Sequence, residues 1–576
     1  MTRRDRIQSR INLAAGRGKV DLLLKNCKIV NVFSHEVCEG HIAIDSGKII
    51  GVGDYDAVNE VDIKGAYVAP GLIDSHEHLE SAMVTPAQMS RVVIPRGTTT
   101  IIADPHEIAN VCGVKGIEFM MNSVESTPLN AFFMLPSCVP ATPFETSGAK
   151  LLADDLEPMM SRKNVLGLGE LMDFPGVIAG REDIIDKMMI SQEKIIDGHG
   201  PMIKGKELNA YMIGGVKTDH ECSNVKEMKS RLDRGMYIAI REGSAARDLK
   251  TLVQGVTSSN SRRCTFCTDD KNPEDILTEG HIDYSVRKAI KLGLDPITAI
   301  QMATINTAEC YYLRDIGAIA PGYDADLIVI DDLNDFNVLE VYKKGVKVAE
   351  NNKALFDVVE TDTSDVVETV NIKPVSIDDL KIKLSSDIVN VISVKPYSLL
   401  TERNIRKVNL DENGYFEKHK YIDIVKMAVI ERHNATGNIG LGLVENFKLS
   451  GGAIATTIGH DSHNLIVIGD NDEDMLKAIE AVESLEGGIA VVHKGGISTL
   501  QLRIAGLMSD QPMEFVAKRL KELLAIAHDE LNVSTDIDPF MTLSFLALPV
   551  IPDVKLTDKG LFDVVTFDFM EIEVKE

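Results

Sequence analysis

Two histidines one residue apart stand at the end of an apolar segment, PGLIDSHEHLESAMVTP (residues 70–86). Side chains alternate along an extended strand, so His76 and His78 would point to the same side and could bind one metal ion. A pair of surface or hydrogen-bonded histidines is the competing interpretation. Asp74 and Glu77 add carboxylates within the same few residues, which favours a metal site.

Further metal-binding residue types follow along the chain, each where a predicted strand gives way to a loop. In a parallel α/β barrel the carboxyl ends of the strands meet at one face, where catalytic residues gather. Taken singly, each residue has an ordinary explanation as an exposed carboxylate, a turn residue or a helix cap. An ordered set is harder to explain in that way. The residues are His106 in ADPHE, Glu170 in VLGLGE, His199 in DGHGP, His220 in VKTDHE and Asp269 in CTFCTD.

The elements that would position these residues alternate between strands and helices from residue 71 to about residue 315. Apolar runs such as TTTIIADP, NAFFMLPSC, VLGLGELM and MYIAIREGS are separated by helical stretches. Such alternation predicts βα units and therefore a parallel sheet or barrel over residues 71–315.

Short strand patterns flank this region on both sides. Residues 1–70 open with a basic stretch, which we expect to form a surface helix, and continue as β runs between turn residues. Residues 316–355 return to short strands and would complete the same small β-domain. A polar, acidic linker is expected near residues 355–380. Residues 380–576 predict a separate α/β domain, in which residues 470–472 would cap a helix that ends at a Gly-Gly pair.

Composition limits the kinds of partner. The chain has 576 residues, too many for one ordinary domain, and a formal net charge of −26. Nucleic-acid binding normally uses a basic face, so we expect no nucleic-acid partner and a small neutral or cationic substrate instead. No apolar run approaches the roughly 18 residues of a membrane span, so no membrane partner is expected. The eight cysteines lack framework spacing and no apolar leader opens the chain, which favours a cytoplasmic protein with reduced thiols.

One further polar motif stands in the last third of the chain, GHDSHN at residues 459–464. We expect His460, Asp461 and His463 to reach the mouth of the barrel, where they would contact the substrate or an additional metal ion. A hydrogen-bonded turn is the alternative.

Two motifs of the barrel region hold the remaining candidates for substrate binding. His106 and Glu107 could line the substrate pocket or hold an additional metal ion, although His106 could simply cap the following helix. Arg241, Glu242 and Ser244, in AIREGSA, follow a predicted strand and could contact the substrate. For these three an ordinary surface location is an equal alternative.

Together these motifs resemble the amidohydrolase superfamily of metal-dependent hydrolases and, within it, the bacterial and archaeal adenine deaminases. The resemblance rests on PGLIDSHEHLESAMVTP, ADPHEIANV, LGELMDFPGV, DGHGP, KGKELNAY, TDHECSN and GHDSHN, and it covers nearly the whole chain. GHDSHN and its domain are not general features of the superfamily, which makes the resemblance specific. It implies an α/β fold: a (β/α)8, TIM-like barrel with a split small β-sandwich domain and an additional C-terminal α/β domain.

The resemblance also implies a binuclear metal centre. Many relatives bridge the two ions with a carbamylated lysine, where this chain has Glu170. A carboxylate supplies the same two oxygens without carbon dioxide. Manganese or iron is favoured, and zinc is compatible with the same donors. The implied ligands are His76, His78 and Asp269 for one ion and His199 and His220 for the other, with Glu170 between them.

The implied reaction is the hydrolytic deamination of adenine to hypoxanthine and ammonia in purine salvage. A metal-bridged hydroxide would attack C6, because a cation can lower the pKa of water from about 15.7 towards neutral. Asp269 would take the proton and return it to the departing N6, or Glu221 would protonate the ring at N1. Two alternatives stay open: another amidohydrolase that cleaves a C–N bond of a cyclic amide or an N-acetyl sugar, and a catalytically silent barrel scaffold. The family further suggests a homo-oligomer.

Overall fold

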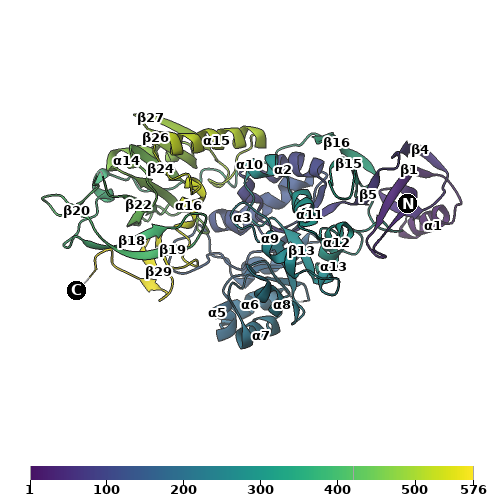
Figure 1. The fold of residues 1–576 in the computed structure, drawn as a ribbon, viewed down its shortest axis with the longest axis horizontal. Coiled ribbons are helices and arrows are strands. Elements are labelled where there is room, and N and C mark those ends of the chain that lie inside the picture. Colours follow the sequence, from purple (N-terminus) through teal and green to yellow (C-terminus); the bar gives the residue numbers. More distant parts are fainter. Residues whose placement is uncertain (1, 192, 420, 575–576) are drawn as a thin grey trace.

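The computed structural model describes residues 2–191, 193–419 and 421–574, which form three regions arranged in a row (Figure 1). A small β-domain lies at one end, the barrel in the middle and the C-terminal domain at the other end. The two chain termini therefore lie at opposite ends of the molecule. None of the helices in the described part of the chain is both long enough and apolar enough to cross a membrane.

The central region is a closed barrel of short parallel strands, which confirms the predicted α/β barrel fold. A five-stranded and a three-stranded parallel sheet are joined by single residue pairs, Ile196 with Val216 and Glu77 with Asp269. The second pair joins the last strand to the first and closes the barrel. In chain order the strands are β6 (Leu72–Glu77), β7 (Thr98–Ala103), β8 (Asn130–Leu135), β9 (Val165–Leu171), β10 (Ile195–Gly198), β11 (Thr218–Asp219), β12 (Tyr237–Arg241) and β13 (Cys264–Cys267).

The barrel strands form where the sequence is apolar or β-branched without alternation, because both of their faces are covered. All six residues of β7, TTTIIA, are buried. Gly71, just before β6, permits β7 to approach the backbone of β6 closely. A Cβ atom there would lie 2.3 Å from Oγ1 of Thr99, so any larger residue would push the two strands apart.

Helices follow the barrel strands. The first, α2 (Pro86–Val93), begins where the side chain of Thr85 accepts a hydrogen bond from the backbone of Gln88, with proline in its first turn. The others are α3 (His106–Glu125), α4 (Ala153–Met160), α5 (Phe174–Ala179), α6 (Glu182–Ile190), α7 (Gly205–Ile213), α8 (Val225–Leu232), α9 (Leu249–Leu252), α10 (Pro273–Thr278), α11 (Ile282–Lys291), α12 (Pro296–Met302) and α13 (Ile305–Cys310).

The small β-domain is assembled from both sides of the barrel sequence. Its sheet has nine strands, and β5 pairs antiparallel with β14, which joins the two segments. The basic opening stretch forms α1 (Arg3–Ala14), of which only Leu13 is buried, so the predicted surface helix is confirmed. The strands are β1 (Val20–Asn31), β2 (Glu36–Asp45), β3 (Lys48–Val52), β4 (Ala57–Asp62), β5 (Tyr67–Pro70), β14 (Leu327–Ile330), β15 (Val338–Lys343), β16 (Val346–Glu350) and β17 (Lys353–Ala354).

The C-terminal domain contains an eight-stranded sheet in the order β19-β18-β23-β22-β25-β24-β26-β27. The predicted cap and Gly-Gly end are confirmed, because Asn471 caps α14, Gly487 lies after the helix and Gly488 begins β26. Its main elements are β18 (Ile388–Val394), β19 (Thr401–Lys407), β22 (Ile424–Ile430), β23 (Ile439–Glu445), β24 (Gly452–Thr456), β25 (Leu465–Gly469), α14 (Asp472–Ser484), β26 (Gly488–His493), β27 (Gly496–Gln501), α15 (Met513–Asp529), α16 (Pro539–Phe545), β28 (Val554–Thr557), β29 (Gly560–Asp563) and β30 (Asp568–Phe569). Two short strands, β20 (Asn409–Leu410) and β21 (Phe416–Glu417), pair with each other.

The chain between barrel and C-terminal domain contacts both. Residues 355–376 contain no helix or strand. Glu360 accepts hydrogen bonds from Thr85 and Gln88 at the start of α2, at 3.0 and 2.7 Å. The backbone oxygen of Val366 accepts a hydrogen bond of 2.6 Å from a backbone N–H of the C-terminal domain. This segment therefore helps to hold the two regions together.

Candidate metal centre

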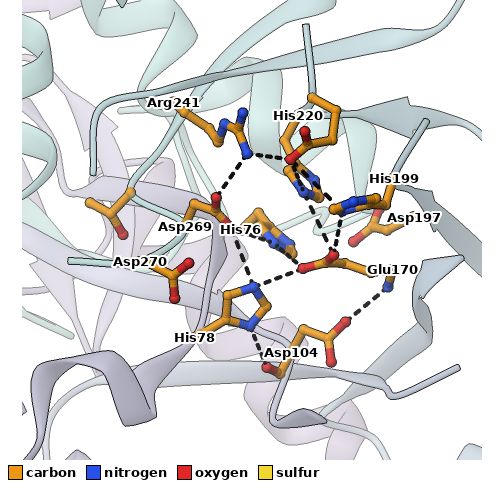
Figure 2. A network of polar contacts seen from close by, with 12 residues as sticks. His76, His78, Asp104, Glu170, Asp197, His199, His220, Arg241, Asp269 and Asp270 are labelled. Carbon is orange, nitrogen blue, oxygen red and sulfur yellow. Dashed lines mark hydrogen bonds and ion pairs between the residues drawn. The ribbon is translucent and has the colours of Figure 1, made fainter. Parts of the chain in front are cut away.

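Glu170 stands at the centre of a cluster of imidazoles and carboxylates at the carboxyl ends of the barrel strands (Figure 2). Its Oε1 lies 2.9 Å from Nε2 of His76 and 2.7 Å from Nε2 of His78. Its Oε2 lies 2.7 Å from Nδ1 of His199 and 3.7 Å from Nε2 of His220. Each carboxylate oxygen therefore faces one pair of histidines.

Asp269 adds a second carboxylate to one of these pairs. Its Oδ1 lies 3.3 Å from Nε2 of His76 and 3.2 Å from Nε2 of His78. Within each group the donor atoms all lie within 4.8 Å of one another. The structure thus brings all six candidate ligands into two adjacent groups that share Glu170. One group is His76, His78, Glu170 and Asp269, and the other is Glu170, His199 and His220.

The hydrogen bonding of His78 shows that these residues fit a metal ion. Its Nδ1 lies 2.9 Å from the backbone oxygen of Asp104 and must donate, because a carbonyl only accepts. When the ring is neutral, the lone pair of Nε2 faces oxygens of Glu170 and Asp269, which are also acceptors. Nε2 of His76 and Oε1 of Glu170 are buried and have no hydrogen-bond partner in the described part of the chain. A cation between these atoms would satisfy all of them.

The two carboxyl groups of the cluster have pKa values well below the ordinary range, so they are negatively charged and favour a bound cation. Burial raises the pKa of Glu170, but the surrounding imidazoles hold it well below its ordinary value. Burial also raises the pKa of Asp269, and the adjacent imidazoles of His76 and His78 outweigh that effect. In turn, burial lowers the pKa of His76, yet Asp269 and Glu170 raise it to about 10. The carboxylates are therefore ionised and attract whichever cation or proton can enter.

Asp104, directly after β7, orients two candidate ligands, His78 just after β6 and Glu170 on β9. Its Oδ2 accepts a hydrogen bond of 2.8 Å from the backbone N–H of Glu170, while its backbone oxygen accepts from His78. Gly169 makes room for this contact, since a Cβ atom there would lie 2.1 Å from Oδ2 of Asp104. Sequence reasoning missed Asp104, although its position directly after a strand, in ADPHE, was the available signal. Such partners of metal ligands fix ligand orientation.

Arg241 was a candidate for substrate contact, and the structure surrounds it with carboxylates. Its NH1 lies 3.1 Å from Oδ2 of Asp269 and also pairs with Glu221. Its NH2 lies 3.2 Å from Asp248. Oε1 of Glu221 in turn lies 3.5 Å from Nε2 of His220. The guanidinium therefore fixes the carboxylates of Glu221 and Asp269 at the edge of the candidate metal centre. Figure 2 shows its contact with Asp269.

The GHDSHN segment of the C-terminal domain reaches this end of the barrel. Nδ1 of His460 lies 3.1 Å from Oε1 of Glu107, and Oδ1 of Asp461 lies 4.0 Å from Nε2 of His106. The ring of His106 packs edge-on against that of His78, with centroids 4.4 Å apart. Two adjacent residues of the barrel, His106 and Glu107, thus face two adjacent residues of the C-terminal domain. Both contacts lie beside the candidate metal ligand His78.

A cavity that is partly open to solvent lies between the barrel and the C-terminal domain. Three candidates for substrate contact line it and five do not. The hydroxyl of Ser244 is also used inside the protein, because it donates a hydrogen bond of 2.6 Å to Asp275. The lining candidates are Glu107, Ser244 and His460, and those outside the lining are His106, Arg241, Glu242, Asp461 and His463.

Sequence reasoning missed other residues of the cavity wall. Asp270 directly follows Asp269, and Ser81 lies three residues after His78, so their position near a motif was a usable signal. Ser544 and Phe545 belong to α16, and no motif in the sequence marks them.

Comparison with known proteins supplies independent information. The family model described as amidohydrolase family matches residues 67–348, and the one described as adenine deaminase C-terminal domain matches residues 398–568. The adenine deaminase of Clostridium acetobutylicum is 54% identical over 568 residues, which cover 98% of this chain and 100% of that protein. The adenine deaminase of Nitratidesulfovibrio vulgaris (strain DP4) is 48% identical over 577 residues and the full length of both chains. Among solved structures, a β-aspartyl dipeptidase of Fervidobacterium islandicum AW-1 has 19% identity and a TM-score of 0.44, over 58% of this chain and 98% of that chain.

Proposed function

Because this chain belongs to the adenine deaminases of the amidohydrolase family and hydrolyses adenine to hypoxanthine and ammonia, we propose that the cluster around Glu170 is its catalytic centre. The family implies a divalent metal centre. The observation that carries the proposal is the placement of Glu170, whose two oxygens face two separate pairs of histidines. A single carboxylate in that position can serve two ions at once.

The donor types agree with this assignment. Mixed imidazole and carboxylate donors suit manganese, iron or zinc, and we propose manganese or iron as the working metal. When bound, such ions lower the pKa of a water molecule and supply a hydroxide nucleophile at neutral pH. The residues that would hold them are His76, His78 and Asp269 on one side and His199 and His220 on the other, with Glu170 between.

Asp269 is the proposed proton carrier. Its backbone is held in place on both sides, because its N–H donates to the oxygen of His76 and its oxygen accepts from the N–H of His78, both at 3.0 Å. Arg241, 3.1 Å from Oδ2, limits rotation of the carboxylate. Asp269 would accept a proton from the nucleophilic water and transfer it to N6, so that ammonia rather than an amide ion departs.

Glu221 is the second proposed participant in proton transfer. Its carboxylate lies beside His220 and Arg241, with a side chain that is 15% exposed, so a purine could reach it. We propose that Glu221 in its protonated form donates a hydrogen bond to N1 of adenine and transfers that proton as C6 becomes tetrahedral. Glu221 regains a proton from the C6 hydroxyl when the carbonyl group of hypoxanthine forms. A proton on N1 draws electron density away from C6, which favours attack by the nucleophile.

The test is turnover of adenine by the purified full-length chain. Protein reconstituted with Mn(II) or Fe(II) should release ammonia and shift the purine absorbance, whereas chelator-treated protein should do neither. Metal content is measured on the same samples and should approach two ions per chain. Absence of adenine turnover with manganese, iron and zinc alike would contradict the proposal.

A further inference from the structure

The cavity between barrel and C-terminal domain has buried polar atoms that nothing in the described part of the chain satisfies. Oγ of Ser544 and Oε2 of Glu80 both belong to lining residues and have no hydrogen-bond partner there. The two residues are only 3% and 2% exposed. Buried polar groups are normally hydrogen-bonded, so these atoms indicate a ligand with polar groups of its own.

An aromatic surface lies on the C-terminal side of the same cavity. The rings of His460 and Phe545 are stacked, with centroids 4.4 Å apart and planes inclined by 25°. Glu107 holds His460 from the barrel side at 3.1 Å. The short helix α16 is capped by Asp538, which accepts hydrogen bonds of 2.9 Å from two backbone N–H groups, so Phe545 is presented by an ordered element. Flat apolar surfaces of this kind suit a planar heteroaromatic ring.

The charges around the cavity restrict the ligand further. Its ionisable lining is acidic apart from His460, and no lysine or arginine lines it among the residues that the structure describes. Carboxylates accept hydrogen bonds from ring N–H and amino groups, whereas they repel a phosphate. The acidic lining residues are Glu80, Glu107, Asp270 and Asp538.

The cavity also adjoins the metal centre. Asp270 directly follows the proposed proton carrier Asp269, and its Oδ1 accepts a hydrogen bond of 2.5 Å from Ser81. Ser81 lies three residues after His78. A planar ligand in the cavity would thus lie beside the carboxyl ends of β6 and β13.

We infer that this cavity holds the purine base during deamination, that Ser544 and Phe545 of the C-terminal domain bind the base, and that the acidic lining selects a free base over a nucleotide. The inference rests on the proposed function. The C-terminal domain is then part of the substrate site, because one wall of the pocket belongs to it.

The test compares Phe545→Leu and Ser544→Ala with the wild-type, metal-loaded enzyme. Stacking on an aromatic side chain contributes enough that Phe545→Leu should raise KM for adenine by about 5- to 100-fold. Ser544→Ala should raise KM by about fivefold, as expected for one neutral hydrogen bond. In both variants kcat and metal content should stay near the wild-type values, because neither residue contacts the cluster around Glu170. The matched control is Phe515→Ala, which removes a 54%-exposed phenylalanine of the same domain outside the cavity.

Competition experiments with the same purified enzymes test whether the acidic lining of the cavity excludes a phosphate group. Hypoxanthine should inhibit adenine turnover by the wild-type enzyme, and AMP should not. Unchanged KM in Ser544→Ala and in folded Phe545→Leu, or inhibition by AMP equal to that by hypoxanthine, would overturn the inference. Ser544→Ala decides the matter alone if Phe545→Leu does not fold. Failure of the wild-type enzyme to deaminate adenine would instead overturn the proposed function and this inference with it.

Discussion

The two sides of the cavity are built in opposite ways. On the barrel side, charged groups from several strands are held by backbone hydrogen bonds and by one another, as Asp104 holds Glu170 and Arg241 holds Asp269. On the C-terminal side, one short helix presents an aromatic ring and a hydroxyl without a partner among the described residues. This difference fits the two proposals above, in which the barrel residues catalyse the reaction and the C-terminal domain binds the base.

The reason for this division lies in the architecture. Parallel strands that converge at one barrel end can place many polar side chains within a few ångströms. Such a cluster has little apolar surface against which a purine could pack. The C-terminal domain covers that end and supplies the missing surface. The small β-domain, by contrast, contributes no described residue to the metal cluster or the cavity lining.

The largest expected effect comes from Glu170→Gln. An amide has one acceptor oxygen in place of two and no charge, so it cannot serve both groups of histidines. Metal content should fall below two ions per chain, and activity should fall by far more than the roughly 10–100-fold that changes to partners of metal ligands cost. Elemental analysis and adenine turnover measure both, with the exposed Glu473→Gln as control. Full metal content in Glu170→Gln would contradict the assignment of Glu170 as the carboxylate that both metal ions share.

Asp269→Asn should have the next largest effect. The amide retains an oxygen for the metal but cannot carry the proton, so kcat should fall by about 10²- to 10⁴-fold with metal retained. Steady-state kinetics with adenine, beside metal analysis, measures this. The neighbouring Asp270→Asn is the matched comparison. It removes a charge from the cavity lining and should therefore alter KM more than kcat. Near wild-type kcat in Asp269→Asn would remove it as the proton carrier.

The smallest expected effect concerns the stability of the C-terminal side. Burial lowers the pKa of Lys555 to about 7. Its Nζ donates to the backbone oxygens of Phe545 and Leu399, at 3.0 and 3.1 Å. The unfolded chain, with an ordinary lysine pKa near 10.4, binds more protons than the folded chain between pH 7 and 10, so this group makes the free energy of unfolding rise with pH.

Urea unfolding at pH 7 and pH 9 tests this expectation. The wild-type enzyme should gain about 2 kcal/mol in the free energy of unfolding from this group as the pH rises from 7 to 9, and Lys555→Met should lack that gain. The exposed Lys518→Met serves as the control, because its side chain lies on the surface of α15. An equal pH response in wild type and Lys555→Met would show that the buried amine does not affect stability.

Prediction from the sequence worked best where the signal was local. His76, Glu170 and Asp269 each lie in or directly after a short apolar segment, and such segments became the barrel strands. Arg241 carried a local signal too, but its ion pairs with Asp269 and Glu221 join three different segments, and the sequence does not show them. Ser544 carried no local signal, because nothing around it differs from an ordinary apolar helix.

The sequence by itself determined the order of strands and helices, the residues at the strand ends and the resemblance to a family. These depend on short-range periodicity and on motifs a few residues long. Only the tertiary structure decided that Glu170 divides its two oxygens between two pairs of histidines, and that Phe545 faces the barrel through His460. Contacts between segments hundreds of residues apart depend on how domains pack, and no local pattern in a single sequence encodes that packing.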